Sequence, residues 1–211
     1  MDHIYFLGGS PCSGKSTFAE MIAEKYDMYY FKIDDYLNKY TELGENDDIH
    51  LIKKLQMMTI DEMWLRDPKK QSLDEVLYYK EIFYYIMRDL DKFPKDKKII
   101  TEGAALMPCL MREHEVDTSK YICIVPKKEF QIEKYSKREW VDDYLSSSSD
   151  KKKAFENWME RDVLFAQYVL RDCQRYGYES LVVDDSQSLA ENFKVVERVL
   201  KLGTVWIKYI N

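Results

Sequence analysis

The amino-acid sequence predicts an α/β fold built on a mostly parallel sheet. Five short apolar runs of the kind that form buried strands alternate with longer segments of helical character. A glycine-rich loop follows the first run, and acidic residues follow the second, third and fifth runs. This alternation is typical of a doubly wound chain, in which helices cover a parallel sheet.

The strands are expected at residues 4–7, 28–33, 98–101, 121–125 and 181–183. Helices are expected at 15–25, 73–91 and 151–176, and again after Leu189. The tail at 204–210 looks strand-like, but it has no assigned place in the sheet. The sequence contains no internal repeat and no linker rich in Pro or Gly, so we expect one domain over residues 1–211.

The segment at about 36–95 is predicted to be a helical insertion between the second and third strands. Its clearest part has apolar residues at spacings of three and four, which places them on one helix face: Val76, Tyr79, Phe83, Ile86 and Leu90. Pro94 ends this helix. The face predicts a helix packed on the core, with Tyr79 as part of that core.

Composition excludes several classes of protein. Hydrophobic residues make up 45% and charged residues 33%, which argues against disorder. The net charge of −6 argues against a nucleic-acid partner, which would require a basic face. No run approaches the roughly 18–20 apolar residues of a membrane span, and residues 1–7 lack a signal-peptide pattern. The cysteines form no CxxC pair, so a reducing, cytoplasmic location is expected.

The glycine-rich loop matches G-x-x-x-x-G-K-[ST] in full. Its residues are the predicted nucleotide contacts: Gly9, Ser10, Pro11, Cys12, Ser13, Gly14, Lys15, Ser16 and the following Thr17. Glycines let successive N–H groups point into one hollow, and the following helix N-terminus adds positive charge there. Lys15 can then reach the β- and γ-phosphates of ATP, and Ser16 can bind Mg²⁺. A chance Lys-Ser after a glycine turn is the alternative.

Together with the order of the later elements, this loop resembles the P-loop kinases of the nucleoside- and nucleotide-kinase type. The Asp34-Asp35-Tyr36 segment, the Thr101-Glu102-Gly103 segment and a later Arg-bearing segment occur in the family's order. The resemblance implies a five-stranded parallel sheet of order 2-3-1-4-5. It also implies Mg-ATP as phosphoryl donor, an acceptor-binding role for the insertion, and a small hydroxyl or phosphate compound as acceptor.

Three carboxylates follow strands, and ligands of doubly wound sheets bind at the carboxyl ends of strands. The Asp34-Asp35-Tyr36 segment resembles that of uridine and nicotinamide riboside kinases, which implies that Asp34 serves the acceptor hydroxyl, with Asp35 as the second choice. Glu102 resembles a Walker B residue that assists Mg²⁺ or binds substrate hydroxyls. The alternatives are that an aspartate caps the next helix and that Glu102 is a solvated loop residue.

The segment at about 134–153 is predicted to be a lid, because transferring a phosphoryl group needs cations and exclusion of water. Arg138 and Arg161 are the candidates for γ-phosphate contact and catalysis. The alternative is that they lie on the solvent-exposed face of a helix without binding a ligand, as most surface arginines do. Asp162 lies on the apolar face of the 151–176 helix. A carboxylate there needs a partner, so a structural ion pair is expected.

The sequence therefore favours phosphoryl transfer from Mg-ATP to a small molecule. The acceptor stays open among nucleosides, nucleotides, hydroxy acids and antibiotics. One alternative is an ATPase or nucleotide-dependent switch that acts through a protein partner. Another is a kinase of nucleic-acid ends or aminoacyl-tRNA, which the acidic balance disfavours although 134–153 is locally basic.

Overall fold

The computed structural model describes residues 2–203 and contains a five-stranded, all-parallel sheet of order β2-β3-β1-β4-β5. The central strand β1 (Ile4–Gly8) pairs with β3 (Ile99–Glu102) on one side and with β4 (Tyr121–Pro126) on the other. The edge strands are β2 (Tyr29–Lys32) and β5 (Ser180–Val183). The predicted fold class and strand order are confirmed.

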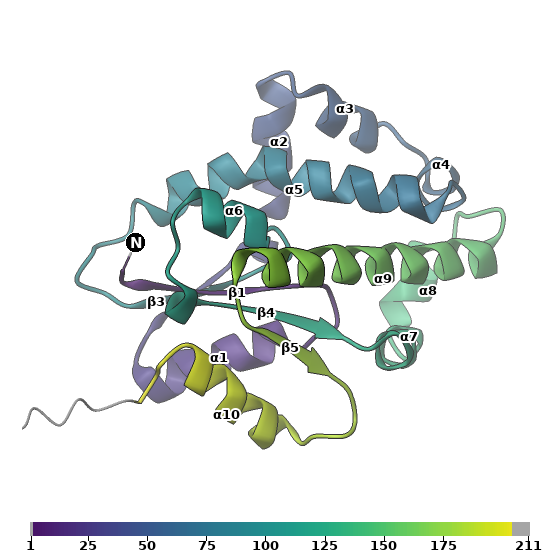
Figure 1. The fold of residues 1–211 in the computed structure, drawn as a ribbon. Coiled ribbons are helices and arrows are strands. Elements are labelled where there is room, and N and C mark those ends of the chain that lie inside the picture. The colour runs from purple at the N-terminus through teal and green to yellow at the C-terminus, as the bar shows by residue number, and fades with distance from the viewer. Residues whose placement is uncertain (1, 204–211) are drawn as a thin grey trace, which may run out of the picture.

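Helices cover both faces of this sheet, because successive residues of each buried strand point to opposite sides. On one face lie α1 (Lys15–Tyr26) and α10 (Leu189–Val199), and on the other lie α5 (Pro68–Leu90), α6 (Pro108–Glu113) and α9 (Lys151–Tyr176) (Figure 1). In β1, the side chains that pack toward α1 and α10 are Tyr5 and Leu7, whereas Ile4 and Phe6 pack toward α5 and α9.

The chain turns sharply at the end of β2. The strand ends at Lys32 and a 3₁₀ turn, η1 (Ile33–Tyr36), follows directly. Ile33 was predicted to end the strand, but it is buried as the first residue of this turn. Asp34 and Asp35 therefore lie in the turn, beyond the carboxyl end of β2, and both are exposed.

The insertion consists of α2 (Leu37–Asn46), α3 (His50–Gln56), α4 (Ile60–Trp64) and α5. Helix α5 begins at Pro68 and not near 73, since Asp67 caps its N-terminus by accepting a hydrogen bond from the Lys69 N–H. It ends at Leu90, before Pro94. Its buried face packs along α9 and includes Val76, Phe83 and Ile86.

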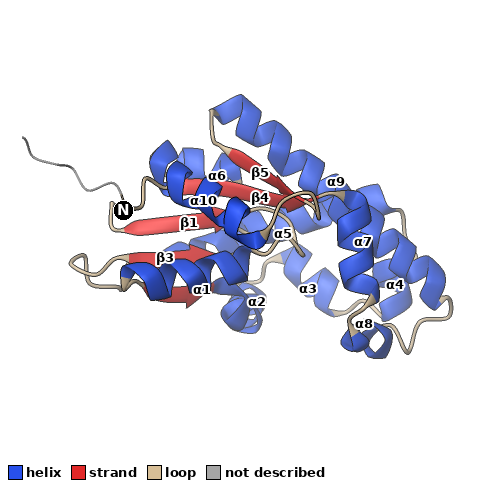
Figure 2. Ribbon diagram, turned by 90° about the horizontal axis from the view of Figure 1, so that it is seen from below, coloured by secondary structure: helices blue, strands red, loops and turns tan. Residues whose placement is uncertain are grey.

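The segment at 134–153, predicted as a lid, contains the end of α7 (Lys128–Ser136), all of α8 (Glu139–Tyr144) and the start of α9. Helices α7 and α8 lie beside α4 at the end of the molecule where the strands terminate (Figures 1 and 2). The serine run at 146–149 separates α8 from α9. A small hydrophobic cluster joins these helices, and its members are Trp64, Tyr135, Val141, Leu145, Ala154, Trp158 and Met159. This cluster is separate from the two that line the sheet.

Sequence analysis did not predict helix α6 or the 3₁₀ turn η2 (Thr118–Lys120). Both are short, and the six residues of α6 are too few to show a helical period. The strand-like tail at 204–210 lies outside the described residues. Within residues 2–203, no helix combines the length and the apolar character needed to cross a bilayer.

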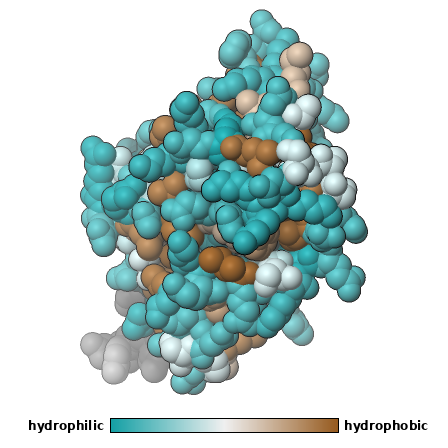
Figure 3. Space-filling model, turned by 90° about the vertical axis from the view of Figure 1, so that its right-hand side faces the viewer, coloured by the Kyte–Doolittle hydropathy of each residue, from teal (hydrophilic) through white to brown (hydrophobic). Residues whose placement is uncertain are grey.

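The end of the molecule that carries the phosphate loop is mainly hydrophilic. Figure 3 views it from the side on which α7 and α8 lie, and small apolar patches are scattered between polar side chains. The carboxyl ends of β4 and β5 point toward this side in Figure 1. Ligands of doubly wound sheets bind at this end, so the functional residues are sought here.

Candidate functional site

The loop between β1 and α1 wraps around the side chain of its own lysine. Lys15 is buried, and its Nζ donates hydrogen bonds to the Ser10 carbonyl at 2.7 Å and to Ser13 Oγ at 3.3 Å. The ammonium group therefore lies within the curve of residues 10–15, next to the N-terminus of α1. Positive charge and backbone N–H groups at a helix start make a site for phosphate.

Gly9 shows why this loop requires glycine. Its φ angle is +115°, and a Cβ atom at this position would lie 1.9 Å from the carbonyl oxygen of Ile124 in β4. The loop is pressed against the neighbouring strand, so a side chain cannot be accommodated without moving the backbone. Cys12 also has a positive φ angle, of 61°, which is uncommon for a residue with a side chain.

Glu102, at the end of β3, connects to the phosphate loop. Ser16 Oγ donates a hydrogen bond to Glu102 Oε1 at 3.1 Å, and the Tyr30 hydroxyl donates to the same oxygen at 3.0 Å. The predicted Mg²⁺ residues, Ser16 and Glu102, are therefore in contact. The alternative of a solvated loop carboxylate does not hold, because Glu102 is 1% exposed.

This pair fits a magnesium ion. Mg²⁺ prefers oxygen ligands and usually takes one or two protein groups together with phosphates and water. Within residues 2–203, no three His, Cys, Asp or Glu side chains gather closely enough to hold a metal ion by themselves. A hydroxyl and a carboxylate beside the phosphate loop are therefore a suitable partial set, which a nucleotide would complete.

Burial raises the pKa of the Glu102 carboxyl, and the negative charge of Asp34 adds to the rise. The Lys15 ammonium and the hydrogen bonds from Tyr30 and Ser16 act in the opposite direction. Glu102 is thus a carboxylate held in a poorly hydrated place, where an added cation would be attracted strongly.

Asp34 lies close enough for its charge to act on Glu102, whereas Asp35 is paired with Lys32 at the surface. The Asp34 charge acts on Glu102 and also contributes to the raised pKa values of Tyr78 and Tyr79, whose main cause is burial. Neither aspartate side chain is the acceptor of a helix cap at η1 or α2. Asp35 lies 3.9 Å from the Lys32 ammonium in an exposed ion pair.

A pocket of about 470 Å³ opens beside the phosphate loop. It is lined by Cys12, Ser13, Gly14, Phe18, Phe130, Lys134, Arg138, Val183, Asp184, Asp185, Gln187, Leu189 and Asn192. These residues come from the loop and α1, from α7 and the turn that follows it, and from the end of β5 through the first residues of α10. Asp184 and Asp185, the acidic residues that follow β5, are two of them.

Arg138 belongs to this pocket. Its guanidinium lies 4.9 Å from the centre of the Tyr135 ring and 5.9 Å from that of Trp140, and its side chain is exposed. Its charge lowers the pKa of the Cys12 thiol, although burial raises that pKa more strongly. Arg138 is therefore an exposed cation on a long side chain close to the phosphate loop.

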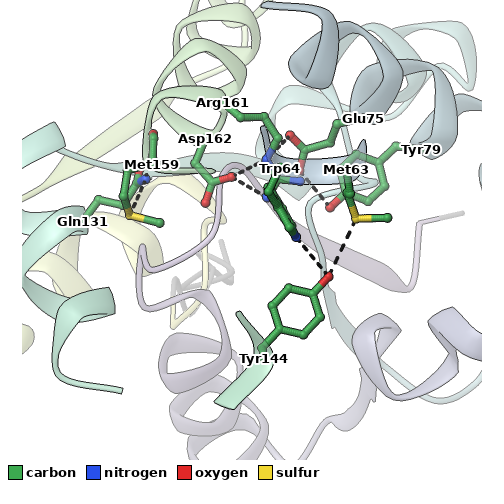
Figure 4. A network of polar contacts seen from close by, with 9 residues as sticks. All are labelled: Met63, Trp64, Glu75, Tyr79, Gln131, Tyr144, Met159, Arg161 and Asp162. Atoms are coloured by element: carbon green, nitrogen blue, oxygen red, sulfur yellow. Dashed lines mark hydrogen bonds and ion pairs between the residues drawn. The ribbon is translucent and has the colours of Figure 1, made fainter. Parts of the chain in front are cut away.

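Arg161 has a different environment, shown in Figure 4. Its Nη2 lies 2.6 Å from Asp162 Oδ1, its Nε lies 3.4 Å from Glu75 Oε2, and its guanidinium stacks 4.9 Å from the centre of the Trp64 ring. The expected ion pair of Asp162 is present, and Asp162 is fully buried. Arg161 is thus engaged by two carboxylates and does not face solvent as Arg138 does.

Sequence analysis missed several residues of this region. Glu75 is buried on α5, four residues before Tyr79, whose hydroxyl donates to it at 3.4 Å. Its acidic side chain next to Val76 in the apolar stripe was a signal of the same kind as Asp162. Gln71 and Trp64 gave no such signal, because their roles depend on contacts between α4, α5 and α9.

Comparison with known proteins extends these observations. No family model matches this chain, and no curated protein is found as a relative. Among solved structures, shikimate kinase from Bacteroides thetaiotaomicron matches with a TM-score of 0.54 at 13% identity, over 94% of this chain and 98% of that one.

Two further structures have lower TM-scores. Deoxyadenosine kinase from M. mycoides with bound dATP gives 0.47 at 15% identity, over 94% of this chain and 99% of that one. Shikimate kinase from Acinetobacter baumannii in complex with shikimate gives 0.44 at 14% identity, over 96% and 94%. At such identities the likeness concerns the fold. The sheet order, the phosphate loop and the match to the first shikimate kinase together show that the chain has the nucleoside- and nucleotide-kinase-like P-loop fold.

Proposed function

We propose that this protein transfers the γ-phosphoryl group of Mg-ATP to a hydroxyl group of a small-molecule acceptor. The observation that supports this most strongly is the contact of Ser16 with Glu102 beside the buried ammonium of Lys15. A hydroxyl, a carboxylate and a lysine converge there on the N-terminus of α1. This is the set that phosphoryl transfer from a nucleoside triphosphate requires.

In this proposal the loop at 9–16 binds the triphosphate through its backbone N–H groups, and Lys15 moves from Ser10 and Ser13 to the β- and γ-phosphates. Ser16 and Glu102 hold Mg²⁺, which neutralises phosphate charge when it is bound. The base and sugar occupy the pocket of about 470 Å³ that the loop shares with α7 and α10.

Asp34 is the proposed base. It accepts the proton of the acceptor hydroxyl while the acceptor oxygen bonds to the γ-phosphorus. The bond from that phosphorus to the β,γ-bridging oxygen breaks, and ADP leaves with the electron pair. Arg138 lies in the lid, where it can approach the negative charge that spreads over the moving group. Asp35 can assist in binding acceptor hydroxyls from the same turn.

An acceptor panel tests the proposal. Consumption of ATP is measured with Mg²⁺ alone and then with nucleosides, nucleotides, sugars, hydroxy acids and aminoglycoside antibiotics, and products are identified by mass. We expect at least one compound to gain a phosphoryl group. Hydrolysis at the same rate with and without every compound would support the ATPase or switch instead.

A further inference from the structure

A second pocket of about 200 Å³ lies between α3, α4 and α5, with Arg161 of α9 in its wall. Tyr78 and Tyr79 line it, and the Asp34 charge acts on both hydroxyls, so the pocket lies on the side of Asp34. If the proposed kinase function holds, this is the place for the acceptor. The following inference rests on that function and concerns the charge of the acceptor.

The cations of this pocket are already neutralised. Among the described residues that line it, the cationic ones are Arg66 and Arg161. The Arg66 guanidinium forms an ion pair with Asp74, to which Lys54 also comes within 3.8 Å. Arg161 is paired with Asp162 and Glu75, as described above. A carboxylate or phosphate on the acceptor would therefore have to displace a protein carboxylate from its partner.

Two oxygen atoms of residues that line this pocket, in contrast, accept no hydrogen bond. Gln71 Nε2 donates to the Trp64 carbonyl at 3.2 Å and to the Arg66 carbonyl at 2.8 Å, and these two bonds fix which way its amide points. Its Oε1 is consequently buried without a hydrogen-bond partner. Glu75 lies one turn later on α5; its buried Oε2 accepts no hydrogen bond, although the Arg161 Nε lies 3.4 Å from it in an ion pair.

The charges around Glu75 also favour a ligand that donates hydrogen bonds or carries a positive charge. Glu75 and Asp162 are both buried and share one guanidinium, so ionisation of both leaves an excess of negative charge. Burial raises the pKa of the Glu75 carboxyl to about 7, with the Asp162 charge contributing and Arg161 opposing. A protonated amine or an N–H donor would relieve this excess, whereas an anion would increase it.

We propose that the acceptor is an uncharged or amine-bearing hydroxyl compound that offers N–H or O–H donors to Gln71 and Glu75. Compounds that carry a carboxylate or phosphate at the end that enters this pocket are disfavoured. Of the acceptor classes open from sequence, this selects nucleosides and amine-bearing antibiotics over nucleotides and hydroxy acids.

The test compares acceptors that differ in charge on one scaffold. Adenosine and cytidine are assayed against their 5′-monophosphates, and glucosamine and glucose against glucuronate, with Mg-ATP and the full chain. We expect kcat/KM to be at least about tenfold higher for the uncharged or amine-bearing member of each set that reacts, since an anion would meet the buried carboxylates of this pocket and repel them. Preference for the phosphate or carboxylate member would overturn the inference.

A variant of Glu75 tests whether this residue binds the acceptor. Glu75→Gln keeps the size of the side chain but replaces an acceptor oxygen by a donor, and we expect the KM for the best acceptor to rise about tenfold with the KM for ATP unchanged. The control Glu81→Gln alters an exposed carboxylate on the same helix and should change neither. An unchanged acceptor KM in a folded Glu75→Gln variant would contradict the inference.

The outcomes separate the two proposals. If no compound of either charge is phosphorylated, the kinase function fails and this inference fails with it. If anionic compounds are phosphorylated in preference, the kinase function stands and the inference alone is wrong. The comparison of acceptors on the unmodified chain remains decisive even where Glu75→Gln does not fold.

Discussion

The hydroxyl of Ser16 donates a hydrogen bond to Glu102 Oε1 over 3.1 Å, although 86 residues separate the two in the chain. The contact joins the first turn of α1 to the carboxyl end of β3. It arises because β1 and β3 are neighbours in register, which brings their ends to the same edge of the sheet. The sheet order thus determines which carboxylate meets the phosphate loop.

The first prediction concerns Glu102. Glu102→Gln keeps the hydrogen bonds available to Ser16 and Tyr30 but removes the charge, so we expect turnover to fall about 100-fold, in the range of a lost preorganised charge contact. The Mg²⁺ concentration for half-maximal activity should rise. Tyr30→Phe is the control, since it removes one hydrogen bond and no charge. Equal magnesium dependence of Glu102→Gln and the unmodified protein would show that Glu102 does not assist the metal.

The second prediction separates the two aspartates of η1. Asp34→Asn should lower kcat about 10²- to 10⁴-fold, the usual contribution of a general base, and should leave ATP binding unchanged. Asp35→Asn should lower kcat less than tenfold, because Asp35 is exposed and pairs with Lys32. Steady-state kinetics and calorimetry with ATP measure both effects. A larger loss for Asp35→Asn would exchange the roles of the two residues.

The third prediction separates the two arginines. Arg161→Ala leaves Asp162 and Glu75 buried without a cation, so the free energy of unfolding should fall by about 3 to 5 kcal/mol. Arg138→Ala removes an exposed side chain and should leave stability within about 0.5 kcal/mol while reducing kcat. Chemical denaturation and kinetics on both variants measure this. A folded, stable Arg161→Ala would mean that its ion pairs contribute little.

The fourth prediction is a pH dependence of stability. The pKa of Glu75 is raised from 4.5 to about 7, so the folded protein holds this proton at pH values where the unfolded chain has released it. The folded state then binds more protons, and the free energy of unfolding should fall as pH rises from about 4.5 to about 7 and level off above. Denaturation of Glu75→Gln across this range should show a flatter profile, and identical profiles would contradict the assignment.

The parts of the site that were predicted from sequence are those whose chemistry is contained in a short segment. The loop at 9–16 is recognisable because its spacing and its flanking strand and helix are local. The location of Glu102 and Asp34 was predicted because strand ends of a parallel sheet meet at one edge. Their roles came from the resemblance to P-loop kinases and stay predictions.

The environment of Arg161 could not be predicted in the same way. The sequence shows Asp162 beside it, but Glu75 reaches it from α5 and Trp64 from α4. The amide of Asn157 on α9 likewise donates to the Trp64 carbonyl at 2.8 Å. Such contacts depend on how three helices pack, and packing leaves no periodic signature in the residues that make the polar contacts.

Binding of ATP by calorimetry, with and without Mg²⁺, tests the central claim most directly. Lys15 contacts its own loop in this structure, so Lys15→Met should keep the fold while losing the ammonium that the phosphates require. We predict magnesium-dependent affinity for ATP in the unmodified protein and a loss of at least about tenfold in Lys15→Met, since charge-assisted contacts to phosphate are strong. Absence of magnesium-dependent affinity for any nucleoside triphosphate in the unmodified protein would contradict the account.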